Sequence, residues 1–180
     1  MTNFLSELSR VASWLHLTSA CLLLLGASGC EPQQPKPLEP MTVGITGYNY
    51  TSEGVQDYYV NGQRGSNIPP YGGGGSVSCC VSLPPKWSPD LVVSVHWTMG
   101  RWTTPYETRK HLTIRQQIEC CSTERALEKT IPVERYGKEG GRLQVFFLPN
   151  DEIQVWVYDA GPQNPEHPSQ RSYPKKPKVE

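Results

Sequence analysis

The feature that most constrains the fold is a hydrophobic pattern with a period of two residues. Successive side chains of a β-strand point to opposite faces, so this alternation predicts half-buried strands and argues against long helices. The pattern predicts an all-β fold, a small antiparallel β-sandwich or partly open barrel of about seven strands. The clearest alternation covers residues 77–83, 91–98, 143–147 and 153–157, and shorter candidate strands cover residues 43–46, 56–60 and 129–135.

Turn residues and composition support this fold class. The chain contains 16 glycines and 17 prolines, which favour many turns. Asn61-Gly62 predicts a two-residue hairpin, because both positions tolerate a positive φ. The folded domain is expected over residues 41–160. Residues 99–128 lack clear alternation and form an insertion, in which residues 116–127 could hold a short helix.

The N-terminal region resembles a bacterial lipoprotein signal. A run of leucines is followed by the small residues Ala27, Ser28 and Gly29, and then by Cys30. The apolar run is too short to span a bilayer stably, as a signal-peptide core should be. Residues 1–29 are therefore expected to be removed, and the thiol of Cys30 is expected to carry lipid. The alternatives are an ordinary secretory signal with an incidental cysteine, or an uncleaved anchor.

The segments on either side of the domain are predicted to be extended or disordered. Residues 30–40 comprise the lipidated Cys30 and a Pro-rich tether. Residues 161–180 contain five prolines and three lysines and are predicted to be a disordered tail. Glu31 is not the aspartate that commonly retains lipoproteins at the inner membrane. The expected location is the bacterial cell envelope, facing the periplasm and more typical of the outer membrane.

Four further cysteines lie in the expected exported domain as two adjacent pairs. An even count in an exported chain predicts two disulfides. Neighbouring side chains in a strand point to opposite faces, which disfavours a Cys79–Cys80 bond and favours pairing between Cys79-Cys80 and Cys120-Cys121. The insertion would then be disulfide-linked to the domain. The competing interpretation, a four-cysteine zinc site, is disfavoured because adjacent cysteines lack the usual spacer.

No catalytic, cofactor or metal site is predicted. Lys plus Arg equals Asp plus Glu at 17 each, so there is no basic excess for nucleic acid. The glycines before Ser76 have no following lysine or helix, so they predict a turned loop rather than a phosphate site. No spacing places a nucleophile beside a base. The protein is therefore expected not to be an enzyme.

The candidate partner-binding residues are Trp156, Tyr158 and His96. Trp156 and Tyr158 alternate away from the apolar side of their predicted strand. If that face is open, they and His96 could form an amphipathic contact patch, since tyrosine and tryptophan are frequent binding anchors. The alternative is that a second sheet covers this face and makes the rings part of the core.

An ordered series of motifs resembles a bacterial lipoprotein family of unknown function, often found in proteobacteria. The resemblance covers about residues 42–165. It implies no catalytic residue. Family members are often encoded beside lipase-type effectors of type VI secretion, which implies a role as an immunity protein. The motifs are Gly47-Tyr48-Asn49-Tyr50-Thr51, Val60-Asn61-Gly62, Gly72–Ser76 followed by Cys79-Cys80-Val81-Ser82-Leu83-Pro84, Lys86-Trp87, Pro132–Tyr136 and Phe147–Asp151.

Two hypotheses of function follow. The first is a lipid-anchored binding module facing the periplasm, whose most concrete form is an immunity protein that neutralises a type VI secretion phospholipase effector. The alternative is a structural or assembly lipoprotein of the envelope without a toxin partner. In both, the membrane is reached through the lipid on Cys30.

Overall fold

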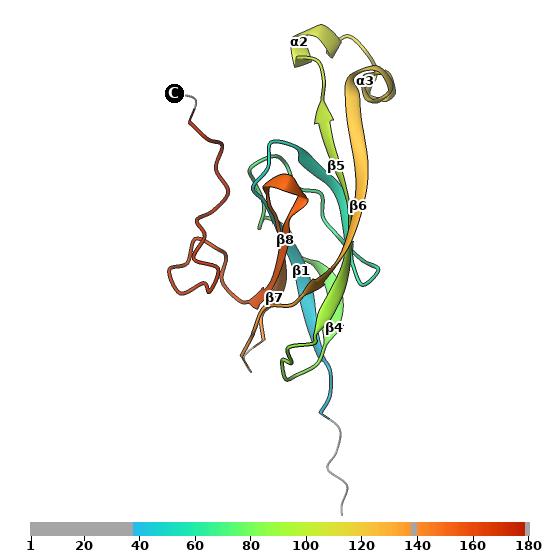
Figure 1. Ribbon diagram of the computed structural model, residues 1–180. Helices are drawn as coiled ribbons and strands as arrows, with labels where there is room; N and C mark the ends of the chain where they lie inside the picture. Colours follow the sequence, from blue (N-terminus) through green and yellow to red (C-terminus); the bar gives the residue numbers. More distant parts are fainter. Residues whose placement is uncertain (1–37, 138–139, 179–180) are drawn as a thin grey trace, which may run out of the picture. The chain divides into compact units, whose positions relative to one another are not determined.

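The computed structural model describes residues 38–137 and 140–178. In this part of the chain, eight strands form two four-stranded sheets that pack as a sandwich (Figure 1). The sequence-based prediction of an all-β sandwich is thereby confirmed, with one more strand than the seven expected. Residues 1–37, which include the predicted signal and Cys30, lie outside the described part.

The first sheet, here called sheet A, has the order β4-β1-β7-β8. Its strands β1 and β7 run parallel, whereas the β1–β4 and β7–β8 pairs are antiparallel. A short 3-10 turn, η1, joins the last two strands where the sequence predicts a turn, and its Asn150 and Asp151 have positive φ. The bounds are β1 Met41–Asn49, β4 Ser78–Leu83, β7 Arg142–Phe147, η1 Pro149–Asp151 and β8 Ile153–Tyr158.

The second sheet, sheet B, has the order β3-β2-β5-β6 and is antiparallel throughout. Asn61 and Gly62 form the β2–β3 turn with φ of 49° and 79°, as predicted. Strand β6 begins seven residues earlier than the predicted strand at residues 129–135. Its bounds and those of its neighbours are β2 Gly54–Val60, β3 Gln63–Gly65, β5 Val92–Trp102 and β6 Ser122–Pro132.

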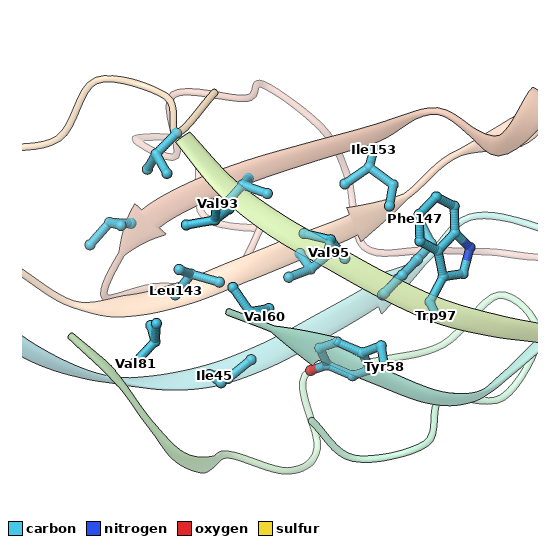
Figure 2. Close-up of a cluster of buried hydrophobic side chains, with 14 of the residues drawn as sticks. Ile45, Tyr58, Val60, Val81, Val93, Val95, Trp97, Leu143, Phe147 and Ile153 are labelled. Carbon is cyan, nitrogen blue, oxygen red and sulfur yellow. The ribbon is translucent and has the colours of Figure 1, made fainter. Parts of the chain in front are cut away.

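The inner faces of the two sheets form the hydrophobic core (Figure 2). Strand β5 contributes Val93, Val95 and Trp97, and the equivalent positions of β7 contribute Leu143, Val145 and Phe147; all are at most 1% exposed. The Phe147 ring lies 5.2 Å from the Tyr58 ring and 6.1 Å from the Trp97 ring, between centroids. Burial of these large rings supplies much of the stability of the sandwich.

The pairing of the cysteines differs from the expectation. The disulfides join Cys79 to Cys80 and Cys120 to Cys121, so no disulfide connects the two pairs. The β1–β4 register changes between Val43↔Val81 and Ile45↔Ser78, which places a bulge at Cys79-Cys80 and interrupts the strand alternation. Cys120 and Cys121 end a helix, where neighbouring side chains do not point to opposite faces. The insertion is therefore not linked to the rest of the domain by a disulfide.

Because each disulfide joins adjacent residues, reduction should destabilise the domain only slightly. On the loop-entropy relation, the smallest closed loop contributes about 1 kcal/mol, whereas a bond between the two pairs would contribute about 4 kcal/mol. Urea unfolding with and without reductant measures the difference. A loss near the larger value, or non-reducing peptide maps that join residues 79–80 to residues 120–121, would contradict the adjacent pairing.

The hairpin β2–β3 depends on a glycine beneath an aromatic ring. A Cβ at Gly65 would lie 1.9 Å from Cζ of buried Tyr58. Gly65→Ala should therefore lower the free energy of unfolding by about 1–3 kcal/mol through overpacking. Gly75→Ala is the matched control, because a Cβ there meets no heavy atom within 4 Å. Equal urea midpoints for the two variants would refute this packing constraint.

Candidate functional site

Trp156 and Tyr158 lie side by side on the outer face of β8, where the sequence places them. Both are half-buried, and the segment that covers them is a C-terminal stretch without strand or helix, not a second sheet. Residues 161–173, here called the C-terminal strap, run over this face of sheet A. The fully buried ring of His167 lies 5.8 Å from the Trp156 ring and 5.0 Å from the Tyr158 ring.

The strap corrects the prediction of a disordered tail. Hydrogen bonds fix it at distant points of the chain: Tyr50 Oη donates to the Ser172 carbonyl at 3.0 Å, and Tyr173 Oη donates to the Gly73 carbonyl at 2.8 Å. Composition predicted disorder because the segment has many prolines and no hydrophobic period. The hydrogen bonds that hold the strap join residues about a hundred positions apart, and no local sequence pattern predicts such contacts.

His96 does not join the two predicted aromatic residues. It is exposed on the outer face of sheet B, opposite Tyr59 of β2 and Glu128 of β6. Its ring centroid lies 6.2 Å from that of Tyr59. Trp156 and Tyr158 belong to the outer face of the other sheet, so the predicted three-residue patch does not exist as one surface.

A different surface stands at the far end of β5 and β6. These strands pair at every position from Val92↔Pro132 to Trp102↔Ser122 and carry two helices at their end (Figure 1). The helices are α2 (Tyr106–Arg109) and α3 (Ile114–Cys121). Residues 102–121, here called the tip, fill most of the insertion that the sequence left uncertain, and α3 overlaps the short helix expected there.

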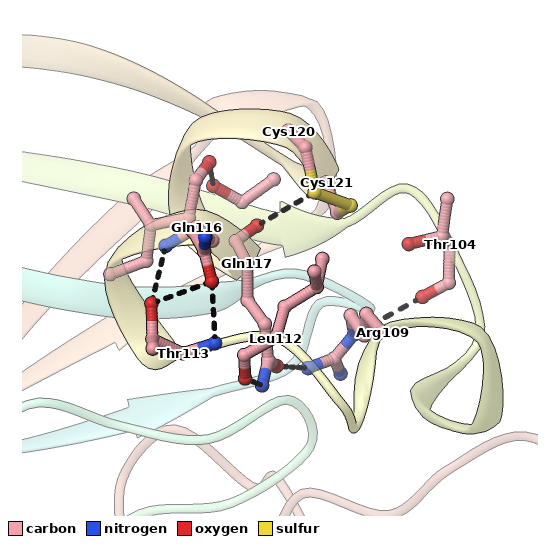
Figure 3. The surroundings of a disulfide bond; sticks show 10 residues. Thr104, Arg109, Leu112, Thr113, Gln116, Gln117, Cys120 and Cys121 are labelled. Carbon is pink, nitrogen blue, oxygen red and sulfur yellow. Dashed lines mark hydrogen bonds between the residues drawn. A yellow bond between two sulfur atoms is a disulfide. The ribbon is translucent and has the colours of Figure 1, made fainter.

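The tip is held together by its own polar contacts (Figure 3). Arg109 is buried; its Nε donates to the Thr104 carbonyl at 3.3 Å, and its Nη1 donates to Oε1 of Gln117. Gln117 Nε2 in turn donates to the Leu112 carbonyl at 2.9 Å. The Arg109 guanidinium also lies 3.7 Å from the centre of the Trp102 ring. These contacts lock α2, α3 and the end of β5 into one unit.

Local sequence chemistry explains where α3 begins and how it rejoins the ladder. Thr113 caps the helix: its Oγ1 accepts from the Gln116 backbone N–H, and the Gln116 side chain accepts from the Thr113 N–H. At the other end, the Thr103 N–H donates to the Cys121 carbonyl at 2.8 Å. This bond continues the β5–β6 pairing past its last residue.

Large hydrophobic side chains nevertheless remain exposed on the tip. Ile114 and Ile118 are four residues apart and therefore share one face of α3. No core requirement explains their exposure, and exposed groups of apolar side chains usually mark a contact surface. The exposed fractions are 45% for Trp102, 61% for Tyr106, 68% for Ile114 and 46% for Ile118.

An ionic cluster braces the base of the tip. The carboxylate of Glu53 accepts from Arg125 of β6 at 2.7 Å and lies 3.8 Å from Arg101 of β5. Arg125 also donates to Asp151 of η1 at 2.6 Å. Hydrogen bonds to Asp151 and Glu53 raise the pKa of Arg125. The cluster joins both strands of the ladder to the main body at the base of the tip.

Metal-binding clusters and the cavity beside the glycine loop are the features of the described residues that bear on the predicted absence of a metal or phosphate site. Among them, no group of three or more histidine, cysteine, aspartate or glutamate side chains is placed to hold a metal. A cavity of about 250 Å³ beside the glycine loop has no charged side chain in its lining. Gly73 and Gly74 have positive φ, as a turned loop requires. No helix of residues 38–137 and 140–178 has the length and apolarity to cross a membrane.

The geometry defines a β-sandwich that presents an apolar tip. Residues 48–155 match the model of a family described as "Protein of unknown function (DUF3304)", and the chain belongs to that family. The matched region includes the whole tip and ends before the strap. No curated protein matches the chain, and no solved structure does.

Sequence reasoning missed the tip residues. Trp102, Tyr106, Ile114 and Ile118 lie in the stretch without alternation, where the expected strand and helix boundaries were unclear. One signal was present: Ile114 and Ile118 stand at helical spacing after Thr113, a typical N-cap residue. That signal predicts an amphipathic helix but not whether its apolar face is buried.

Proposed function

We propose that this protein is a lipid-anchored binding module of the bacterial cell envelope that holds a protein partner at its tip. The observation that carries the proposal is the exposed apolar surface of Trp102, Tyr106, Ile114 and Ile118 on a braced support. Tryptophan and tyrosine are enriched among residues that dominate binding energy, and a rigid support limits the entropy lost on binding.

The position of the tip favours a protein partner over the anchoring membrane. The chain enters the domain at Leu38 and starts β1 at the end opposite to α2 and α3 (Figure 1). The 11 residues of β5 span about 35 Å from that end toward the tip. A lipid on Cys30 would therefore join the chain on the side of the domain opposite to the tip, which leaves the tip available to a periplasmic partner.

The most concrete form of the proposal is an immunity protein that neutralises a lipase-type effector of type VI secretion. The lipid would place the inhibitor at the surface where such a toxin acts, and the tip would occlude the toxin. Support for this form comes from the family resemblance, and support for the binding surface comes from the exposed tip. The expected location is the outer membrane, because Glu31 follows Cys30.

The binding role can be tested with a lipase-type effector encoded beside the gene. Ile114→Ala and Ile118→Ala should each weaken binding about 30-fold if they are hot spots, with unchanged melting temperature. Val92→Ala is the control, because Val92 is 48% exposed but lies at the opposite end of β5. Calorimetric titration of an inactive effector measures the change.

The proposal can be contradicted at two levels, the contact surface and the immunity role. An equal loss in Val92→Ala, or none in the tip variants, would remove the tip as the contact surface. Unchanged survival of cells that lack this gene but carry the active effector would refute the immunity role. An envelope defect without effector sensitivity would instead support a structural or assembly lipoprotein.

The lipid anchor is tested separately by replacing the thiol of Cys30. Cys30→Ser should block acylation and processing, so the protein should accumulate as a longer precursor. Cys21→Ser is the matched control, because Cys21 is expected to leave with the signal. Immunoblots of membrane fractions report both size and location; normal size and membrane retention of Cys30→Ser would refute the lipoprotein assignment.

A further inference from the structure

The C-terminal strap rests on an aromatic surface of sheet A through one buried histidine. His167 stacks on Phe146, with ring centroids 5.6 Å apart and planes 22° apart, and meets the edges of Trp156 and Tyr158. Nothing in the proposed function uses this arrangement. The strap itself contains no strand or helix, so these ring contacts and a few hydrogen bonds hold it.

The hydrogen bonds of His167 require a neutral ring. The Ser169 backbone N–H donates to Nδ1 at 3.1 Å, so Nδ1 carries the lone pair and the proton sits on Nε2. A second proton on Nδ1 would face the Ser169 N–H and break this bond. Ser169 Oγ lies 2.8 Å from Nδ1 and could accept that proton, but a neutral hydroxyl does not offset the charge gained. Protonation would also place a charge in a ring that is fully buried.

No acidic side chain of the described residues forms an ion pair with the ring that would offset such a charge. The ionisable groups on the elements packed around His167 are Tyr48 of β1, Arg142 of β7, Tyr158 of β8, and Glu166, Arg171 and Tyr173 of the strap. None of them makes a hydrogen bond or ion pair with the His167 ring among the contacts of the described residues, and two are cationic. Burial accordingly lowers the pKa of His167 below its usual value.

The docked strap also leaves polar atoms without partners. Within the described residues, Gln144 Oε1, Trp156 Nε1 and His167 Nε2 are buried and make no hydrogen bond to another protein atom. A buried polar atom without a partner weakens the state that buries it, and opening would return His167 Nε2 to water. The strap is therefore a region where local opening should occur well before global unfolding.

We propose that the strap is a pH-sensitive cover: protonation of His167 releases residues 161–173 from sheet A and uncovers Phe146, Trp156 and Tyr158. This device is independent of the proposed function at the tip. The docked state holds a neutral ring, whereas the released state takes up a proton freely. The docked strap is thus fully stable above pH 6.5 and loses stability as pH falls below that value.

The coupling between proton binding and strap release determines how strongly pH changes the docked-to-released ratio. If the docked ring stays neutral throughout, lowering the pH from 7.5 to 5.0 shifts the docked-to-released ratio by about 30-fold. Hydrogen exchange of the purified full-length protein, read by mass spectrometry and corrected for intrinsic rates, should show protection of residues 161–173 falling by up to that factor. Peptides from β7 should keep their protection, which separates strap release from unfolding.

Two histidine variants make the test specific. His167→Phe keeps an aromatic ring on Phe146 but cannot titrate, so its strap protection should not depend on pH. His96→Gln removes an exposed histidine and should leave the wild-type pH dependence unchanged. Should His167→Phe fail to fold, the imidazole signal of His167 in the wild type, titrated by NMR, must still give a pKa below 6.5.

Strap protection that is equal at pH 7.5 and 5.0 in the wild type would refute the proposal. So would a His167→Phe protein that shows the same fall in protection, or an NMR pKa at or above 6.5. Release confined to the wild type and His96→Gln supports it.

Discussion

The packing of β5 against sheet A is the constraint on which the rest of the structure depends. The inward side chains of β5, including Val93, Val95 and Trp97, are almost completely buried against β7 and its neighbours. The same strand then continues past the sandwich and carries the tip. Its position in the core therefore fixes the direction in which Trp102 and the two helices project.

Strand β6 connects the tip to the body in a second way. It pairs with all 11 residues of β5, yet most of its side chains are exposed. Its inward side carries Arg125 and Lys129, which reach Asp151 of η1 instead of entering the core. Inward-pointing charges on an edge strand oppose further strand pairing, so this edge is protected from aggregation while the tip remains accessible.

The elements that were predicted correctly are those whose pattern lies within a single strand or turn. Leu143–Phe147 and Ile153–Val157 alternate cleanly, and both became strands with the expected residues inward. The Asn61-Gly62 turn likewise depends only on local φ preferences. The Cys79–Cys80 bond was missed because a bulge, created by register with β1, interrupts the alternation.

The candidate site was predictable only in part, because its accessibility depends on distant contacts. The orientation of Trp156 and Tyr158 away from the core followed from period two. That the strap covers them depends on pairs such as Tyr50 with Ser172, 122 residues apart. Conversely, the exposure of Ile118 depends on α3 standing beyond the sandwich, which no local pattern shows.

The central claim is that the tip, and not a sheet face, contacts the partner. Photo-crosslinking in living cells tests it most directly, with a photoreactive residue placed either at Tyr106 of the tip or at Val77 beside β4. Both positions are exposed, at 61% and 51%, so reactivity alone does not distinguish them. A lipase-type effector encoded beside the gene should be crosslinked from position 106 and not from position 77. Crosslinking from position 77 alone, or from neither position when effector and protein are both present, would contradict it.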